Sequence, residues 1–495
     1  MSKFKEYSLS KSLDSNIEMI KKIFNNNDDT LIIRSFQNQH NNSLKCCIFF
    51  IEGMVNNEII NENIILPIVE TSIPSIKSNF IEYLQYQVIV SNNLQKTDSI
   101  DQLIEAVISG NTILFAENSL EAIIIDTKGW QSRAIEEPIV ERVLRGPREG
   151  FTECIMVNLA LIRRKLRTSD LKFEFTTLGE RTNTKACICY IEGLANEKIL
   201  KELHKRLESI SIDGVLDVNY INELVSDSPL SPFETTGSTE RPDIIAAKLL
   251  EGRIALVLDG TPVVMTVPYL FIEYFQSNED YYLNYYFASI GRVLRIFGFI
   301  ASISIPAVYL SLVAFHQEMI PTPLIMSIYA ARQGVPFPTA IELIVLLITF
   351  EILREAGTRM PSYIGQALSI VGALVLGSSA VEARLVSAPI VIVVGLSGIT
   401  GLMIPKIKSV SVTMRFIFLF LSSLLGLYGY IFGMSALLIH LFSIRSFGVP
   451  YMSNLTSLHL QELKDTTIRS PWWYMKDRPG SLSKNLRRTS RGQRQ

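Results

Sequence analysis

The hydrophobic residues divide the chain into two parts. Before about residue 285, short runs of β-branched and aromatic residues alternate with polar stretches of helical periodicity, which is typical of an α/β fold. After that point, long stretches carry no Asp, Glu, Lys or Arg: 297–315, 363–381, 385–405 and 416–444. About 20 predominantly apolar residues span a bilayer. The pattern therefore predicts an α/β cytosolic region followed by an all-α polytopic membrane domain.

The α/β region contains an internal repeat. CCIFFIEGMVNNEII (46–60) and ACICYIEGLANEKIL (186–200) are identical at seven of fifteen positions when aligned without a gap. In both, an apolar strand ends in Ile-Glu-Gly and a helix is expected to follow. A weaker similarity relates 109–118 to 251–260. Solenoid repeats have periods of about 20–50 residues. The two copies here begin at residues 46 and 186, and this much larger separation indicates a duplicated domain.

These patterns predict six segments. They are a variable, disordered N-terminus (1–29), a first α/β subdomain (30–140), a linker with a helix (141–170), a second, related subdomain (171–285), a transmembrane domain of four to six helices (286–446) and a short basic cytosolic tail (447–495). Six crossings are expected if 339–356 spans the membrane and 416–444 is a hairpin. Four crossings are the alternative.

The distribution of charged residues predicts how the chain is oriented in the membrane. The net charge of −1 provides no field that would attract nucleic acid. Positive residues flank the apolar stretches, and the segment after Arg445 is basic. Because cytosolic flanks are enriched in Lys and Arg, both termini are expected on the cytosolic side.

No catalytic set is recognisable. The chain has no Gly-rich phosphate loop, nucleophile elbow or HExxH motif. We therefore expect neither an enzyme nor a cofactor. The five cysteines (46, 47, 154, 187 and 189) are expected to be reduced. A metal site built from the two cysteine pairs is the alternative, although their spacing matches no common zinc pattern.

Two features of the apolar part are candidate functional sites. Glu342 and Glu351 lie in one apolar helix, about 13 Å apart at 1.5 Å per residue. Carboxylates at membrane depth usually face a bundle interior or water, but both could instead be solvated at the interface. The second feature is a helix with one face of small residues, predicted to line a pore or to pack closely against other helices. Its candidate pore-lining residues are Gly365, Ser369, Val371, Gly372, Leu376 and Ser379, with Leu376 or Val371 closing the pore.

The linker contains a turn, RGPREG (145–150), and then a helix with a basic end at Arg163, Arg164, Lys165 and Arg167. The basic end is either solvated or a docking surface for a partner or anionic lipid. We predict that Arg145, Arg148 and Glu149 couple the modules or support assembly.

Several long motifs resemble one known family. They are RGPREGFTE (145–153), FTTLGERTNTKACICYIEGLAN (175–196), STERPD (238–243), GVPFP (334–338), FEILREAGTRMPSYIGQALSIVGALVLG (350–377) and RSFGVPY (445–451). With these motifs the chain resembles the A subunits of the GerA family, which are parts of nutrient germinant receptors in bacterial endospores. The resemblance covers nearly the whole chain after about residue 30.

The resemblance implies a location and partners. It places the protein in the inner membrane of the spore, beside a transporter-like B subunit that binds the nutrient and a lipoprotein C subunit. It also implies a homo-oligomer that forms a cation channel, opened when nutrient binds. A secondary transporter and a pore-less signalling subunit are the alternatives.

Overall fold

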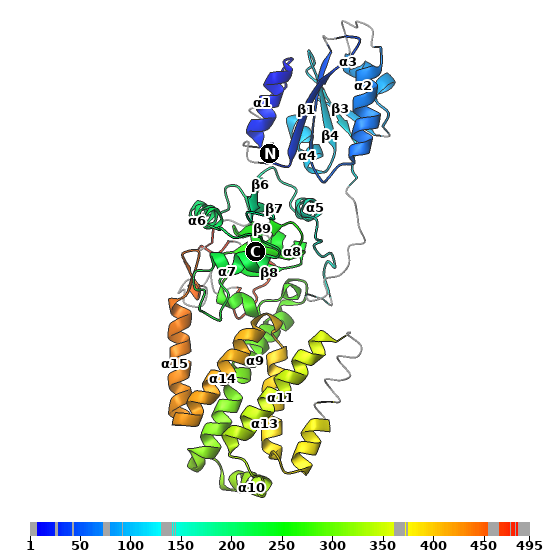
Figure 1. Ribbon diagram of the computed structural model, residues 1–495. Helices are drawn as coiled ribbons and strands as arrows, with labels where there is room; N and C mark the ends of the chain where they lie inside the picture. The colour runs from blue at the N-terminus through cyan, green and yellow to red at the C-terminus, as the bar shows by residue number, and fades with distance from the viewer. Residues whose placement is uncertain are drawn as a thin grey trace.

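A computed structural model describes residues 7–24, 28–41, 44–72, 80–91, 93–129, 145–360, 375–453 and 465–475, together with 141, 143, 372, 477–480, 482 and 483. The molecule has three parts arranged along one long axis. A first sheet domain, coloured blue and cyan, is followed by a second, green sheet domain and then by a helical part (Figure 1).

The first domain is a five-stranded antiparallel sheet in the order β1-β2-β4-β5-β3. Its strands are β1 (Leu31–Gln37), β2 (Lys45–Ile51), β3 (Leu94–Thr97), β4 (Thr112–Ala116) and β5 (Ala122–Ile125). Residues of β2 alternate between two cores, as a strand buried on both faces requires. Cys47, Phe49 and Ile51 pack with α1 (Leu13–Ile23) and α4 (Ile100–Ile108). Cys46, Ile48 and Phe50 pack with the opposite helical layer: η1 (Ile59–Ile65), α2 (Leu66–Glu70), α3 (Phe80–Tyr83) and η2 (Leu84–Val88).

The prediction of a disordered N-terminus at 1–29 is wrong for α1. Leu13, Met19, Ile20 and Ile23 are buried and join the core of the first sheet. These apolar residues lie on one face of the helix, and their burial against β2 and α4 stabilises it.

The second domain repeats the same strand order with new strands, β6-β7-β9-β10-β8. They are β6 (Leu171–Leu178), β7 (Thr184–Ile191), β8 (Gly237–Thr239), β9 (Ile254–Leu258) and β10 (Val264–Val267). Helices α5 (Ile155–Lys165) and α8 (Pro242–Leu250) cover one face, while α6 (Glu197–Glu208) and α7 (Val218–Val225) cover the other. The two repeated sequences form β2 and β7, which occupy equivalent positions in their sheets.

A buried ion pair joins the two sheet domains. Asp28 forms a bridge with Phe173 of β6, and Arg163 of α5 donates to the Asp28 carboxylate at 2.6 Å. Both side chains are fully buried. Arg163 therefore does not belong to a solvated helix end or to an open docking surface, because Asp28 neutralises it inside the protein.

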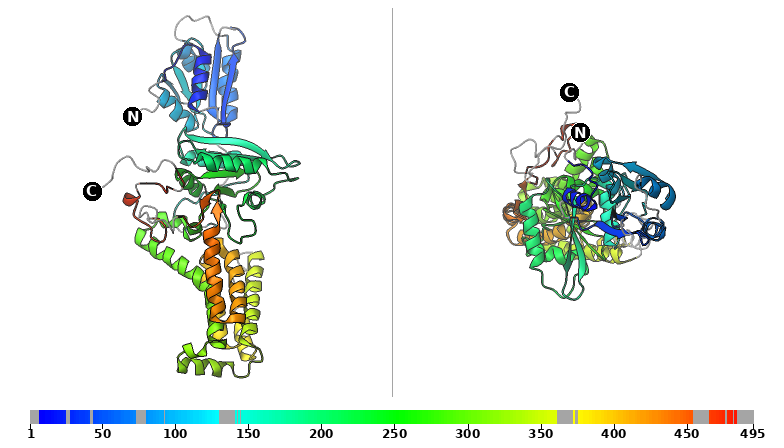
Figure 2. Two further views of the ribbon diagram at one scale, coloured as in Figure 1. Left: turned by 90° about the vertical axis from the view of Figure 1, so that its left-hand side faces the viewer. Right: turned by 90° about the horizontal axis from the view of Figure 1, so that it is seen from above.

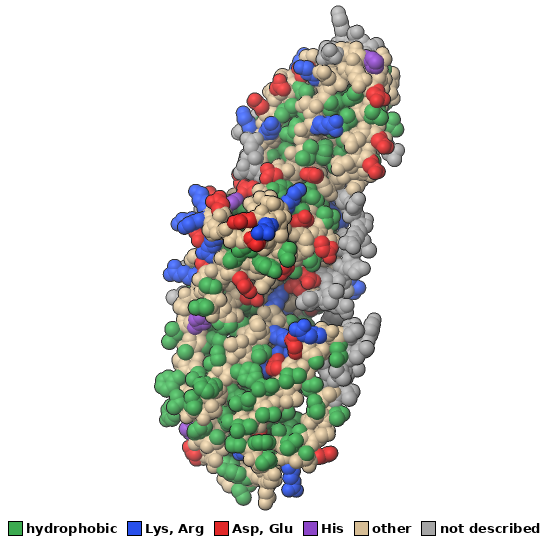
Figure 3. Space-filling view, in the orientation of Figure 1, with side chains coloured by type: hydrophobic (Ala, Val, Ile, Leu, Met, Phe, Trp, Pro, Cys, Tyr) green, Lys and Arg blue, Asp and Glu red, His purple; other side chains and the backbone are tan. Residues whose placement is uncertain are grey.

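The helical part begins with α9 (Tyr285–Ala314) and continues through α10 (Thr322–Arg332), α11 (Thr339–Arg359), a helix at 375–382, α13 (Ala388–Leu402), α14 (Lys408–Leu425) and α15 (Leu427–Ser443). Helices α14 and α15 form a hairpin whose turn is Gly426, at φ +60°. Among the described helices, Tyr285–Ala314 and Pro405–Leu425 are long and apolar enough to cross a membrane, and α13 and α15 are apolar but shorter. Hydrophobic side chains form a broad band on the visible face of this part, and charges lie at its two ends and on the sheet domains (Figure 3).

After α15 the chain returns to the second sheet domain. The strands β11 (Arg445–Ser446) and β12 (Val449–Pro450) form a tight hairpin, with Gly448 at φ +81° in the turn. The described residues 465–475 lie against the start of α9. The predicted tail at 447–495 therefore begins as an integral part of the fold and not as a separate segment.

Candidate functional site

Part of the predicted pore helix lies outside the described residues. This part includes Gly365, Ser369 and Val371. Gly372 is half-buried close to Leu353 of α11. Leu376 is 47% exposed and Ser379 is also exposed. The described end of this helix therefore lies at the edge of the bundle in a single copy of the chain.

The two candidate carboxylates of α11, Glu342 and Glu351, are paired with cations. Glu342 is buried, accepts the backbone N–H of Ser387 at 3.0 Å and lies 3.5 Å from Arg332. Glu351 accepts from Arg415 of α14 at 3.0 Å and also pairs with Arg354. The interpretation that both glutamates are simply solvated does not fit these contacts. Each carboxylate instead links α11 to another element of the bundle.

Arg415 also binds a carbonyl that a proline leaves without its helical partner. Pro306 has no N–H, so the Ser302 carbonyl one turn earlier in α9 cannot form its usual helical hydrogen bond. Arg415 Nε donates to this oxygen at 3.0 Å, and Ser397 Oγ of α13 donates to it at 2.8 Å. A freed carbonyl in an apolar bundle needs such partners. The Ser302 carbonyl of α9, Arg415 of α14 and Ser397 of α13 thus connect three helices at one point.

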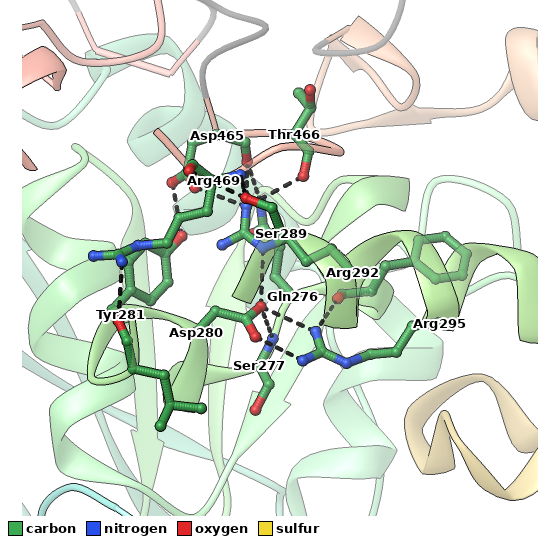
Figure 4. A network of polar contacts seen from close by, with 12 residues as sticks. Gln276, Ser277, Asp280, Tyr281, Ser289, Arg292, Arg295, Asp465, Thr466 and Arg469 are labelled. Carbon is green, nitrogen blue, oxygen red and sulfur yellow. Dashed lines mark hydrogen bonds and ion pairs between the residues drawn. The ribbon is translucent and has the colours of Figure 1, made fainter. Parts of the chain in front are cut away.

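The second sheet domain and the bundle share a polar network at the start of α9 (Figure 4). Asp280, which is buried, accepts from Arg292 Nε at 2.9 Å and from both terminal nitrogens of Arg295 at 2.9 and 2.6 Å. Arg292 also donates to the Asp465 carboxylate at 2.8 Å and to the carbonyls of Asp465 and Thr466 at 3.0 and 3.2 Å. Arg292 therefore connects the loop before α9 to the C-terminal segment.

Burial and the neighbouring cations have opposite effects on the pKa values of the buried carboxyl groups in this junction. Burial raises the pKa of Asp280. Arg295 and Arg292 lower the same pKa by a larger amount, so it lies below its ordinary value. The same balance lowers the pKa of Glu273, which is paired with Arg253 at 2.6 Å and with Lys248. Both carboxylates are thus held as anions inside the junction.

The β11–β12 hairpin attaches the end of α15 to the second sheet domain. Ser446 Oγ donates to the Thr235 carbonyl at 2.6 Å, and the Phe447 N–H donates to Asp227 at 2.6 Å. Tyr451 Oη donates to the Glu234 carbonyl at 2.7 Å. The motif RSFGVPY therefore has a structural role in joining the bundle to the sheet.

The linker is attached to both parts. Glu141 forms an ion pair at 2.7 Å with Lys406, which lies in η6 (Pro405–Ile407) between α13 and α14. Its carboxylate also accepts from Thr239 Oγ1 at 2.5 Å and from the Glu240 N–H at 3.1 Å. Burial raises the pKa of Glu141, but Lys406 and these hydrogen bonds bring the net pKa below its ordinary value. Glu141 therefore joins a sheet edge to a helix connection.

The RGPREG turn is fixed at three points and exposes two cations. Gly146, at φ +123°, lies so close to Tyr282 that an added Cβ would be 2.6 Å from the ring. The Pro147 carbonyl accepts from Arg241 at 2.8 Å, and Glu149 pairs with Lys165 at 2.8 Å. Arg145 and Arg148 are exposed, and no ion pair of either is found within the described part of the chain. They are available to a partner.

Sequence reasoning missed most of the junction. Glu141, Asp280 and Lys406 stand in no catalytic or ligand motif, and their partners lie far away in the sequence. A signal did exist for Arg241, which belongs to the motif STERPD. The cysteine pairs do not form a common site, since Cys46 and Cys47 lie in β2 and Cys187 and Cys189 in β7.

The fold defines a class of protein in which two α/β modules are joined to an apolar helical bundle through a polar junction. Comparison with known proteins identifies the family. Residues 18–481 match the family described as Bacillus/Clostridium GerA spore germination protein. The chain belongs to this family, as its motifs had suggested.

Two relatives that match over most of their length agree with this assignment. The chain is 42% identical over 479 residues to spore germination protein KA of Bacillus subtilis, covering 96% of this chain and 88% of the relative. It is 36% identical over 441 residues to spore germination protein GerLA of Bacillus cereus, covering 88% and 89%. The N-terminal domain of the A subunit of the Bacillus megaterium germinant receptor GerK3 matches at 32% identity and a TM-score of 0.40, over 54% of this chain and 98% of that domain.

Proposed function

We propose that this chain is the A subunit of a spore nutrient germinant receptor and that it forms a ligand-gated cation channel as a homo-oligomer. It works in the inner membrane of the spore with a nutrient-binding B subunit and a lipoprotein C subunit. Its helical part crosses the membrane six times, with both termini on the cytosolic side. The matching strand orders of the two sheets support a duplicated cytosolic domain.

The placement of charge and exposure in the helical bundle carries this proposal. Arg332 and Arg415 neutralise Glu342 and Glu351 inside the bundle of one chain, so neither carboxylate has to face a water-filled pore. The helix at 375–382, by contrast, presents Leu376 and Ser379 at the edge. A ring of copies would bring these edges together around an axis, which would place a hydrophobic constriction beside small and polar residues.

The junction supports gating. The core of the second sheet domain continues into the bundle, since Phe271, Phe299 and Met414 belong to one hydrophobic cluster. A displacement of the second sheet is therefore passed directly to α9 and α14. The exposed pair Arg145 and Arg148 supplies a surface on which the B subunit or a neighbouring copy can act.

The test is cation release from spores that contain normal levels of all three subunits and receive no nutrient. We expect Leu376→Ala and Val371→Ala to release cations spontaneously, because a smaller side chain would leave the constriction open. Val375→Ala is the control for Leu376→Ala, because Val375 is 50% exposed on the same helix but is rotated by about 100° from Leu376. Dormant spores that germinate normally with nutrient would refute the gate and favour a packing role for this helix.

A further inference from the structure

The start of α9 has an exposed apolar face that the junction does not use. Arg292 and Arg295 turn inward to Asp280, so the opposite face carries no charge. Its exposed residues recur at helical spacing: Tyr286, Phe287, Ile290, Val293, Leu294 and Phe297. Phe297 and Tyr286 are both 67% exposed. This face is unusual because it begins beside a sheet domain and continues into the apolar bundle.

The C-terminal segment adds three aromatic residues beside this face. Trp472, Trp473 and Tyr474 form η7 (Trp472–Tyr474), and all three are exposed. The Trp473 ring lies 5.9 Å from that of Tyr285. The backbone of Arg469 and the hydroxyl of Ser289 exchange hydrogen bonds at 3.1 and 3.3 Å, which hold the segment against α9.

The length of α9 indicates what covers this face. Its 30 residues extend about 45 Å at 1.5 Å per residue, which exceeds a hydrocarbon core of about 30 Å. Its uncharged part, Phe297–Ala314, accounts for about 27 Å of this length, so the first third, which carries Arg292 and Arg295, is expected at headgroup level or beyond. In the side view of Figure 2, the start of α9 runs obliquely outward from the other helices. Trp and Tyr are enriched at this depth, where an apolar ring and a polar tip suit the interface.

We propose that the start of α9 and the segment Trp472–Tyr474 form a membrane-interface ledge that lies in the headgroup region of the phospholipid bilayer. The inference rests on the proposed membrane location. On the ledge, the apolar face of α9 contacts the upper acyl chains, and the Trp and Tyr side chains keep their N–H and O–H groups near the headgroups. The ledge fixes the height of the second sheet domain above the membrane.

Tryptophan fluorescence tests the ledge directly, because the chain has only three tryptophans: Trp130, Trp472 and Trp473. The full chain carrying Trp130→Phe is reconstituted into phosphatidylcholine vesicles with bromine either just below the headgroup or near the bilayer centre. We expect shallow bromine to quench the emission roughly twofold more than deep bromine, as an interfacial depth requires. Aqueous iodide should quench it weakly. Trp130→Tyr provides a second background if the first variant elutes differently from the native protein.

Two single-tryptophan controls use a background in which all three tryptophans are Phe. Tyr86→Trp reports an aqueous site, since Tyr86 is 79% exposed in the first sheet domain. Phe420→Trp reports the lipid-facing bundle, where Phe420 of α14 is 63% exposed. Iodide quenching of the ledge equal to that of Tyr86→Trp would overturn the proposal. So would protection from both quenchers, because a second copy would then cover the face.

The same experiment separates this inference from the proposed membrane location. If bromine quenches Phe420→Trp but not the ledge tryptophans, only the ledge is refuted. If the protein does not float with the vesicles and Phe420→Trp is not quenched, the membrane location itself fails and the ledge with it.

Discussion

Replacing Arg292 by Met should release the C-terminal segment from α9. Arg292 is fully buried and gives the segment one charge-assisted hydrogen bond, to the Asp465 carboxylate, and two bonds to backbone carbonyls. Removing one member of a buried ion pair costs about 3–5 kcal/mol. Because Asp465 is 28% exposed and keeps a bond from Tyr281, we take the lower end, about 3 kcal/mol. At about 1.4 kcal/mol per tenfold change, the opening equilibrium should rise roughly a hundredfold.

Hydrogen–deuterium exchange of residues 465–475 in the detergent-solubilised full chain measures this opening. The Arg469 amide, bonded to Ser289 Oγ at 3.1 Å, should exchange roughly a hundredfold faster in Arg292→Met. Arg359→Met is the matched control, because Arg359 pairs with Glu355 at an exposed site and should contribute less than about 1 kcal/mol. A rise of less than about threefold in Arg292→Met would refute the reasoning, since the segment would then be held by other contacts.

Three further perturbations address the linker. Combined Arg145→Ala and Arg148→Ala should change the free energy of unfolding by less than about 0.5 kcal/mol while reducing co-purification with the B subunit; unchanged co-purification and normal germination would count against a docking role. Gly146→Ala should lower that free energy by about 2 kcal/mol or more in thermal unfolding, since its φ is +123° and its Cβ would clash. Gly193→Ala, at φ +75° in open space, should cost only about 1 kcal/mol, and equal effects would contradict the clash. The pKa of Glu141 is lowered in the folded protein. The ionised carboxylate therefore stabilises the fold above the usual carboxyl pKa of about 4.3, and this stabilisation is lost as the pH falls through the lower pKa of the folded state. The stability difference between the native protein and Glu141→Gln should therefore shrink below about pH 4 in thermal unfolding, and a constant difference would show that the ion pair is not the cause.

The sequence was informative wherever a local pattern determined the structure. The repeated strands formed β2 and β7 because their apolar residues fill cores on both faces of a sheet. The sequence left 416–444 as either one long span or a hairpin, and the structure has a helical hairpin whose turn is Gly426, where φ is +60°. Both features follow from the side chains of a short segment, which is why periodicity and turn chemistry could predict them.

The junction was not predictable in this way. Lys406 and Glu141 become partners only after the bundle has placed the α13–α14 connection beside the sheet. The sequence placed Arg163 in a basic helix end that was either solvated or a docking surface, whereas the fold buries it against Asp28, which is distant in sequence. A charged residue gives no local sign of whether its partner is water or a distant side chain, because only the tertiary fold decides its burial. The same limit explains why the pairing of Glu351 with Arg415 was missed.

The segment 234–243 contacts three of the elements that join the sheets to the helices: the hairpin after α15, the linker and the loop before α9. The Glu234 and Thr235 carbonyls accept from the hairpin after α15. Thr239 and Arg241 hold the linker through Glu141, whose other partner precedes α14. Asp243 accepts from the Tyr282 hydroxyl just before α9. A shift of this one segment would therefore displace the ends of α9, α14 and α15 together. Since α9 and α14 also meet at the carbonyl freed by Pro306, the movement would continue into the centre of the bundle without requiring a separate contact for each helix.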